Sequence, residues 1–228
     1  MSLLKRIITF MLAFCSIVYE LLLAQTLAAF LENTVLRYSI TIGLYMFAMG
    51  MGSMLISEKQ LKRPVISLLT TEIALSVAGG FSVILLHSVH ALLPGRIIFL
   101  VAAHALMILV GFLTGFEIPL LLAWKENGLP SSEFKILGVN YFGAFIGAIS
   151  FAFIFYPLIG LLPSALIVGG INALVGTSLI FKQRDVSSGQ EARFRTRWII
   201  QLIFFFVLMI VVVLSGHLNE FFINLYLR

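Results

Sequence analysis

The chain has 228 residues, of which 61% are hydrophobic and only 11% are charged, and its mean hydropathy is +1.09. A soluble globular domain carries about 25% charged residues, so this chain lacks the charge to cover a water-facing surface. The composition excludes a soluble enzyme, a disulfide scaffold, a disordered tail and a nucleic-acid-binding module, and the formal net charge of +5 must be explained by where the charges lie.

Several apolar stretches are long enough to cross a bilayer, for which a helix needs about 20 mainly apolar residues. Strands of a membrane barrel would show alternating hydrophobicity, which the sequence lacks. We therefore predict an all-α fold, a polytopic membrane helix bundle with seven transmembrane helices. The stretches cover residues 7–31, 35–57, 65–88, 97–124, 136–160, 162–181 and 198–216.

The Lys and Arg residues predict the orientation of the bundle. If the N-terminus is cytoplasmic, twelve of the 15 basic residues lie on the inner side, and only Arg37, Arg96 and Arg228 lie on the outer side. Because cytoplasmic loops carry an excess of positive charge, we predict an N-in, C-out topology in a bacterial-type inner (plasma) membrane. The positive charge then indicates contact with the lipid bilayer rather than with nucleic acid.

Three carboxylates and a histidine inside the predicted spans form a candidate intramembrane polar site. Glu20 lies in the first stretch, Glu72 in the third, and His104 and Glu117 in the fourth. Ionisable groups are costly in lipid, usually face the bundle interior and are candidates for function. The carboxylates can share a proton or a cation where their helices touch. Alternatively, each is protonated and hydrogen-bonded to a neighbouring helix, and we interpret His104 as a helix-to-helix hydrogen bonder rather than a ligand.

The fourth stretch contains a predicted helix break. Pro119 has no N–H group, so the carbonyl of Gly115 loses its usual helical partner and the helix can kink. The spacing of Gly111 and Gly115 also allows another helix to approach closely. A carboxylate such as Glu117 between two glycines and a proline is typical of the broken helices that form binding sites in transporters. Alternatively, the kink relieves a span that is longer than the bilayer core.

The fifth and sixth stretches each contain a stripe of small residues with one amide. Residues three and four positions apart share a helix face, so each stripe permits close backbone contact and a hydrogen bond to a neighbouring helix. The connection between the two stretches is short, and we predict an antiparallel hairpin in which the stripes serve helix packing rather than substrate binding. The stripes are Asn140, Gly143, Ala144 and Gly147, and Gly169, Asn172, Ala173 and Gly176.

The last part of the chain differs from the six closely connected stretches before it. Residues 182–197 form a basic cytoplasmic linker, and residues 198–228 contain the seventh transmembrane helix followed by an amphipathic tail. The tail either lies along the outer membrane surface or continues the helix. We therefore divide the chain into a six-helix membrane domain at 1–181, this linker, and the C-terminal helix with its tail.

Motifs for soluble-type catalysis are missing from the sequence. It contains no glycine-rich phosphate-binding loop after a strand, no Gly-x-Ser-x-Gly and no His-Glu-x-x-His. The single cysteine, Cys15, allows no cysteine metal cluster. We therefore predict no catalytic residue, no metal and no cofactor.

A set of segments, taken in order, resembles one family. The segments are SIVYEL at 16–21, AMGMGS at 48–53, EIALS at 72–76, GFEIPLL at 115–121, and GVNYFGAFIGA at 138–148 with PLIGL at 157–161. Over about residues 8–181 they are similar to the membrane domain of membrane-bound spermidine synthase-like proteins, the polyamine aminopropyltransferases. The resemblance implies a multi-span domain that precedes a soluble Rossmann-like domain with a glycine-rich nucleotide loop and a catalytic Asp.

The residues after 181 do not resemble that soluble domain, so we expect no residue of this chain to take over its catalytic roles. We predict a non-catalytic integral membrane subunit, not an enzyme, which packs with other membrane subunits or tethers a separate soluble partner. The alternative is a small transporter or channel for a polyamine or another cation that uses the intramembrane residues Glu20, Glu72 and Glu117.

Overall fold

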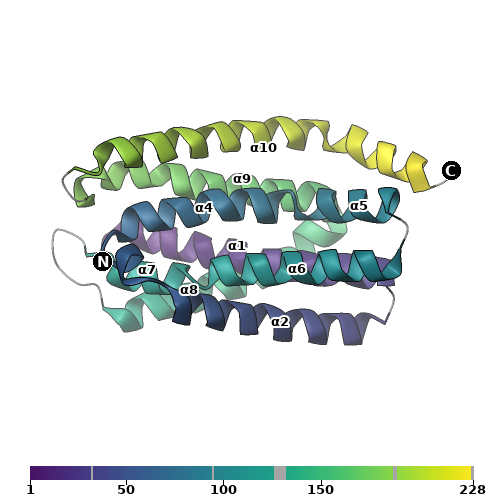
Figure 1. Cartoon of the computed structure of the whole chain (residues 1–228), viewed down its shortest axis with the longest axis horizontal. Coiled ribbons are helices and arrows are strands. Elements are labelled where there is room, and N and C mark those ends of the chain that lie inside the picture. Colours follow the sequence, from purple (N-terminus) through teal and green to yellow (C-terminus); the bar gives the residue numbers. More distant parts are fainter. Residues whose placement is uncertain (32, 94, 126–131, 187–188, 227–228) are drawn as a thin grey trace.

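The computed structural model describes residues 1–31, 33–93, 95–125, 132–186 and 189–226, and every structural statement concerns these ranges. Their regular secondary structure is helical, without a strand, which confirms the predicted all-α fold. The long helices run side by side along the length of the molecule, with α10 at one edge of the bundle and α2 at the opposite edge (Figure 1).

Six helical segments are long and apolar enough to cross a membrane, and α4 (Pro64–Gly80) with α5 (Ser82–Leu92) forms a seventh candidate bent by 41°. A short helix, α3 (Glu58–Leu61), precedes this pair. The number of membrane crossings and their orientation stay predictions. The six segments are α1 (Leu3–Leu31), α2 (Thr34–Leu55), α6 and α7 (Arg96–Thr114, Glu117–Ala123), α8 and the π-helical η1 (Glu133–Ser150, Phe151–Ile159), α9 and the 3-10 helical η2 (Leu161–Ser178, Leu179–Asp185), and α10 (Glu191–Tyr226).

Helix α1 occupies the centre of the bundle. It contacts α2, α6, α8 and α9, and 17 of its 29 residues are buried. On the α8 side, a Cβ added to Gly143 would overlap the carbonyl oxygen of Phe10, and one added to Gly147 would lie 2.8 Å from that of Phe14. The small-residue stripe of α8 therefore permits direct backbone contact with α1.

The stripe of α9 contacts α4 on one side and α10 on the other. A Cβ added to Gly169 would lie 2.7 Å from the backbone of α4, and one added to Gly176 would lie 2.6 Å from the Gln201 amide nitrogen of α10. The buried Asn172 side chain donates to the backbone carbonyl of Glu72 at 3.3 Å. The stripes of α8 and α9 thus pack against different neighbouring helices.

Helix α10 is continuous from Glu191 to Tyr226, so the predicted tail continues the helix and the last part of the predicted linker forms its first turns. The division of the chain into three parts stays a prediction.

Side chains near the start of α10 attach it to α4 and α9. Arg197 donates to the Thr70 hydroxyl of α4. On α9, Trp198 Nε1 donates to the Thr177 carbonyl at 2.8 Å, and Gln201 Nε2 donates to the Ala173 carbonyl at 3.3 Å.

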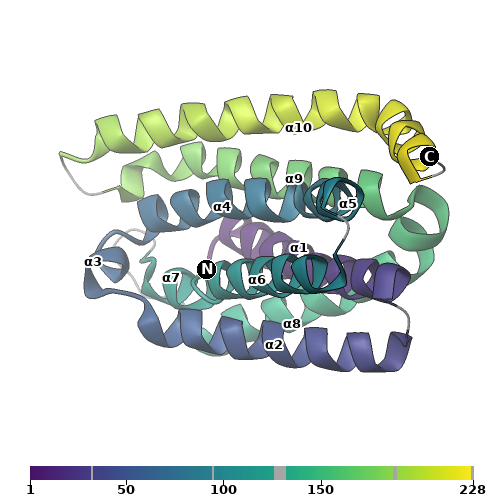
Figure 2. The ribbon, with the colours of Figure 1, turned by 45° about the vertical axis from the view of Figure 1, so that its right-hand side comes forward.

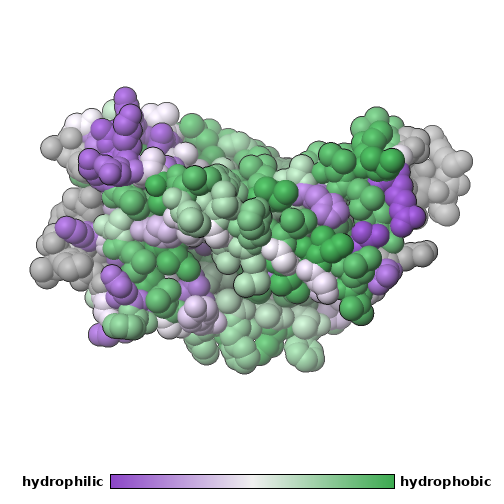
Figure 3. Space-filling model, turned by 60° about the horizontal axis from the view of Figure 1, so that its bottom comes forward, coloured by the Kyte–Doolittle hydropathy of each residue, from purple (hydrophilic) through white to green (hydrophobic). Residues whose placement is uncertain are grey.

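The outer surface is largely apolar. Figure 3 shows hydrophobic side chains over the middle of the visible face, while hydrophilic ones gather toward its two ends. Large side chains such as Phe153, Leu158 and Val213 are more than 70% exposed. This distribution suits a bundle whose sides contact lipid and whose ends contact water.

The contact between α8 and α1 yields a prediction about stability. Gly143→Ala should destabilise the protein by about 1–3 kcal/mol, because the new methyl group overlaps backbone that cannot move without separating the helices. Thermal unfolding in detergent, followed by tryptophan fluorescence, measures the change. Gly138→Ala is the matched control on the same helix, where a Cβ meets nothing within 4 Å. Equal melting temperatures for the two variants would contradict the proposed role of the close contact.

Candidate functional site

A pocket of about 160 Å³ lies between α1, α2, α8 and the junction of α6 with α7. We call it the acidic pocket because two carboxylate side chains, Glu20 of α1 and Glu117 of α7, line it. None of the described residues that line it is basic. The remaining polar side chains of its wall are Ser16, Ser53, Thr114, Asn140 and Tyr141.

The junction between α6 and α7 brings Glu117 into the pocket wall. Helix α6 ends at Thr114, and α7 begins at Glu117, two residues before Pro119. Because Pro119 cannot donate to the carbonyl of Gly115, that carbonyl needs another partner. The Ser53 hydroxyl of α2 donates to it at 2.7 Å. A helix break is thus stabilised by a side chain from the neighbouring helix.

Glycines let α2 and α6 approach closely enough for this hydrogen bond. A Cβ added to Gly111 would lie 2.8 Å from the carbonyl oxygen of Tyr45, and one added to Gly115 would overlap the carbonyl of Met49. From the α2 side, a Cβ added to Gly52 would overlap the carbonyl of Phe112. The predicted packing glycines of the fourth stretch therefore have α2 as their neighbour.

A hydroxyl cluster joins three helices beside the pocket. The buried Tyr45 hydroxyl of α2 lies 2.9 Å from the Thr114 hydroxyl of α6 and 3.2 Å from the Ser16 carbonyl oxygen of α1. Sequence reasoning missed Tyr45 and Thr114, since neither is ionisable and their pairing crosses 69 positions of the chain. The cluster fixes the spacing of α1, α2 and α6 at the level of the pocket.

The three predicted carboxylates do not share one cavity. Glu20 and Glu117, which are 8% and 3% exposed, line the acidic pocket, whereas Glu72 is fully buried outside it. Within the described part of the chain, neither carboxyl oxygen of Glu72 has a hydrogen-bond partner. Glu72 and Glu117 are nevertheless close enough to interact electrostatically. Two of the carboxylates can thus contact a ligand in the pocket, and the third does not line it.

Of the other predicted polar residues, some line the acidic pocket and some do not. Asn140 of α8 lines the acidic pocket, whereas Asn172 is buried against α4. His104 does not line the pocket, and its Nδ1 lies 2.6 Å from the Leu100 carbonyl of its own helix. This nitrogen bonds within α6, and the role of His104 as a helix-to-helix hydrogen bonder stays a prediction.

Curated relatives share a name that states an activity. No protein-family model and no solved structure matches the chain. Polyamine aminopropyltransferase 1 of Streptomyces coelicolor is 34% identical over 176 residues, which cover 75% of this chain and 32% of that protein. The polyamine aminopropyltransferase of Leptospira interrogans is 37% identical over 169 residues, 72% of this chain and 32% of the relative. The polyamine aminopropyltransferase of Oceanobacillus iheyensis is 31% identical over 172 residues, which cover 73% of this chain and 33% of that protein.

These relatives confirm a spermidine synthase-like relationship over about three quarters of the chain. The chain spans about a third of the length of the curated relatives it matches. Their names point to catalysis, so the prediction of a non-catalytic membrane subunit that is not an enzyme was wrong, and so was the transporter alternative. That prediction rested on the missing soluble-type motifs and on the missing resemblance to a soluble catalytic domain after residue 181.

The junction of α6 and α7 yields a second prediction. Ser53→Ala should lower the free energy of unfolding by about 1–3 kcal/mol, because the buried Gly115 carbonyl loses its donor. Ser39→Ala on the exposed side of the same helix is the control and should leave stability nearly unchanged. Denaturant titration in mild detergent checks both. If Ser53→Ala unfolds at the same denaturant concentration as the wild type, the carbonyl does not depend on this bond.

Proposed function

We propose that the chain acts in polyamine aminopropyl transfer and that the acidic pocket binds an amine group of the polyamine. The observation that carries the proposal is the pair of buried carboxylates, Glu20 and Glu117, in a pocket whose described wall contains no basic side chain. A buried carboxylate without an opposite charge is costly, and a bound cation would remove that cost. The activity itself is carried over from the names of the relatives.

The chemistry of the pocket wall suits a polyamine, which alternates ammonium groups with short methylene chains. The carboxylates can form charge-assisted hydrogen bonds with an ammonium group. The hydroxyls of Ser16 and Thr114 can accept its remaining N–H groups. Ile17 and Met49 offer apolar surface to the adjoining methylene groups.

Aminopropyl transfer also needs a proton acceptor. The amine nitrogen bonds to the aminopropyl carbon as the bond from that carbon to the donor breaks, and the donor's leaving group departs with the electron pair. The nitrogen then loses a proton, which a carboxylate within hydrogen-bond reach can accept. Glu117 is placed for this role at the start of α7, where the helix break holds it at the pocket wall. Glu20, which lines the same pocket from α1, would then hold the amine in position.

We also propose that the bundle lies in a bacterial-type inner membrane with seven crossings, N-in and C-out. The support is the length and apolar character of the helices, with α4 and α5 crossing as one bent segment. The excess of Lys and Arg at one end supports the orientation. Under this arrangement the part of the chain that resembles aminopropyltransferases is their membrane-embedded region.

Amine binding provides a direct test of the pocket. Glu20→Gln and Glu117→Gln should each weaken spermidine binding to the purified full chain by roughly tenfold or more, because a hydrogen bond to a charged group is worth about 1.5–3 kcal/mol. Isothermal titration calorimetry measures the affinity. Glu133→Gln, at an exposed site in the first turn of α8, is the control and should bind like the wild type. Equal affinity of all four proteins would place the amine elsewhere.

Aminopropyl transfer is tested in the cell. The gene for this chain is deleted in cells of its source organism. These cells are supplied with a radiolabelled diamine, and the labelled triamine is measured after extraction. Deletion should lower triamine formation, and expression of the wild-type chain or of the Glu133→Gln variant should restore it. Expression of Glu117→Gln should restore less than about a tenth of the wild-type triamine formation, given the usual contribution of a proton acceptor. Unchanged triamine formation after deletion would rule out a role of the chain in this reaction.

A further inference from the structure

A second cavity, of about 300 Å³, lies at the end of the bundle where α3 and the start of α10 meet α4. Figure 2 shows α3 and the beginning of α10 at the same end of the molecule. We call this cavity the basic groove, because its polar rim consists mainly of cationic side chains. They are Lys59 of α3, Arg63 before α4, and Arg193 and Arg197 of α10.

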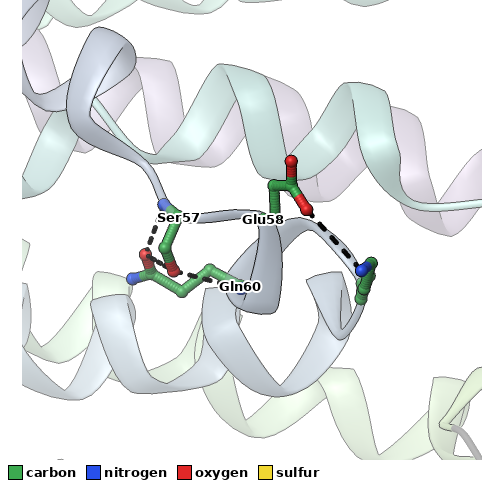
Figure 4. Close-up of polar contacts among 4 residues, drawn as sticks. Ser57, Glu58 and Gln60 are labelled. Carbon is green, nitrogen blue, oxygen red and sulfur yellow. Dashed lines mark hydrogen bonds and ion pairs between the residues drawn. The ribbon is translucent and has the colours of Figure 1, made fainter.

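The charge of the groove is not balanced from within. No acidic side chain is among the described residues that line it. The nearby Glu58 forms an ion pair with Lys62 at 3.6 Å, outside the lining of the groove (Figure 4). Four positive charges therefore converge on one cavity and favour an anion there.

The groove is built from fixed elements. In α3, a capping box joins Ser57 and Gln60: the Ser57 backbone N–H donates to Gln60 Oε1 at 2.9 Å, and the Gln60 N–H donates to Ser57 Oγ at 3.3 Å (Figure 4). The Ser67 hydroxyl of α4 donates to the Gln60 carbonyl at 3.1 Å and so ties α3 to α4. Across the groove, Arg197 donates to the Thr70 hydroxyl and ties α10 to α4. The cationic rim is thus positioned before any ligand arrives.

The wall of the groove also has an apolar side. From Arg63 to Ala74 the lining extends over twelve residues, which are eleven steps of 1.5 Å or about 16 Å. On α4 the hydroxyls of Ser67, Thr70 and Thr71 belong to this lining, and its apolar side is formed by Ile66, Ala74, Leu113 and Phe116. The cationic rim therefore suits a phosphate group, and the apolar side suits a hydrocarbon chain.

We infer that the basic groove binds an anionic phospholipid, with the lipid phosphate among Lys59, Arg63 and Arg193 and an acyl chain along α4. Guanidinium groups present paired N–H donors that match phosphate oxygens, and three of the four cations are arginines. A free phosphate would satisfy the rim alone, whereas a phospholipid also covers the apolar wall. The site is separate from the acidic pocket and does not depend on the proposed aminopropyl transfer.

The test uses the purified full chain in mild detergent and native mass spectrometry with three probes: dioleoyl phosphatidylglycerol, dioleoyl phosphatidylcholine and inorganic phosphate. Phosphatidylglycerol should bind at least tenfold more tightly than phosphatidylcholine, and millimolar inorganic phosphate should not displace it. Lys59→Gln with Arg193→Gln should weaken phosphatidylglycerol binding about 10- to 30-fold, given the usual contribution of each basic residue near anionic lipid.

The control carries the same change in net charge. Lys62→Gln with Arg195→Gln removes two exposed basic residues that are close in sequence but do not line the groove, and its affinity should change less than threefold. Lipid-free melting temperatures of both double variants verify folding, and Arg193→Gln alone replaces the first pair if that pair fails to fold. Equal losses in variant and control would reduce the effect to general surface charge. Equal binding of the two lipids, or displacement by inorganic phosphate, would also overturn the phospholipid assignment.

Discussion

The interruption between α6 and α7 is the constraint on which the acidic pocket depends. Pro119 leaves the Gly115 carbonyl without a helical donor, and in apolar surroundings such a group must find another partner. The Ser53 hydroxyl supplies it, which requires α2 to lie against α6 at distances that only glycines permit. With the break held in this way, Glu117 starts a new helix at the pocket wall instead of continuing an old one. One missing N–H group thus determines the packing of two helices and the position of a carboxylate.

The sequence predicted the helices of this structure but not the contacts between their side chains. The apolar stretches predicted the helices, because about 20 apolar residues have few alternatives to a buried or membrane helix. The glutamates and the glycine-proline pattern pointed to residues of which Glu20, Glu117 and Gly115 line one pocket, since polar groups in apolar helices are rare. The sequence did not predict which side chains contact each other, because such contacts depend on how each helix is rotated and on which helices pack together. Examples are the pairing of Tyr45 with Thr114 and the position of Glu72 outside the pocket. The bend between α4 and α5 also went unpredicted, although Gly79 and Gly80 precede it.

The relationship to aminopropyltransferases changes how the buried polar groups are understood. Apolar composition indicates where a chain lies, but it does not decide whether the chain takes part in a reaction. Carboxylates inside the bundle need not serve ion passage, since a pocket with two carboxylates and several hydroxyls is equally suited to hold an amine. The two cavities have opposite charge: one is lined by carboxylates among α1, α2, α7 and α8, and the other by cations between α4 and α10. The bundle therefore offers separate positions for a cationic and an anionic ligand.

In the proposed membrane location, the length of α10 has a consequence for its behaviour in lipid. Its 36 residues extend about 54 Å, whereas a hydrocarbon core is about 30 Å thick. Arg197, Trp198 and Gln201 attach the helix to its neighbours within a little more than one turn near its start. A helix anchored at one end accommodates hydrophobic mismatch at the other, by tilting or by extending beyond the bilayer. Changes in bilayer thickness would therefore move the C-terminal turns of α10 relative to the membrane surface, while its start keeps its place against α4 and α9.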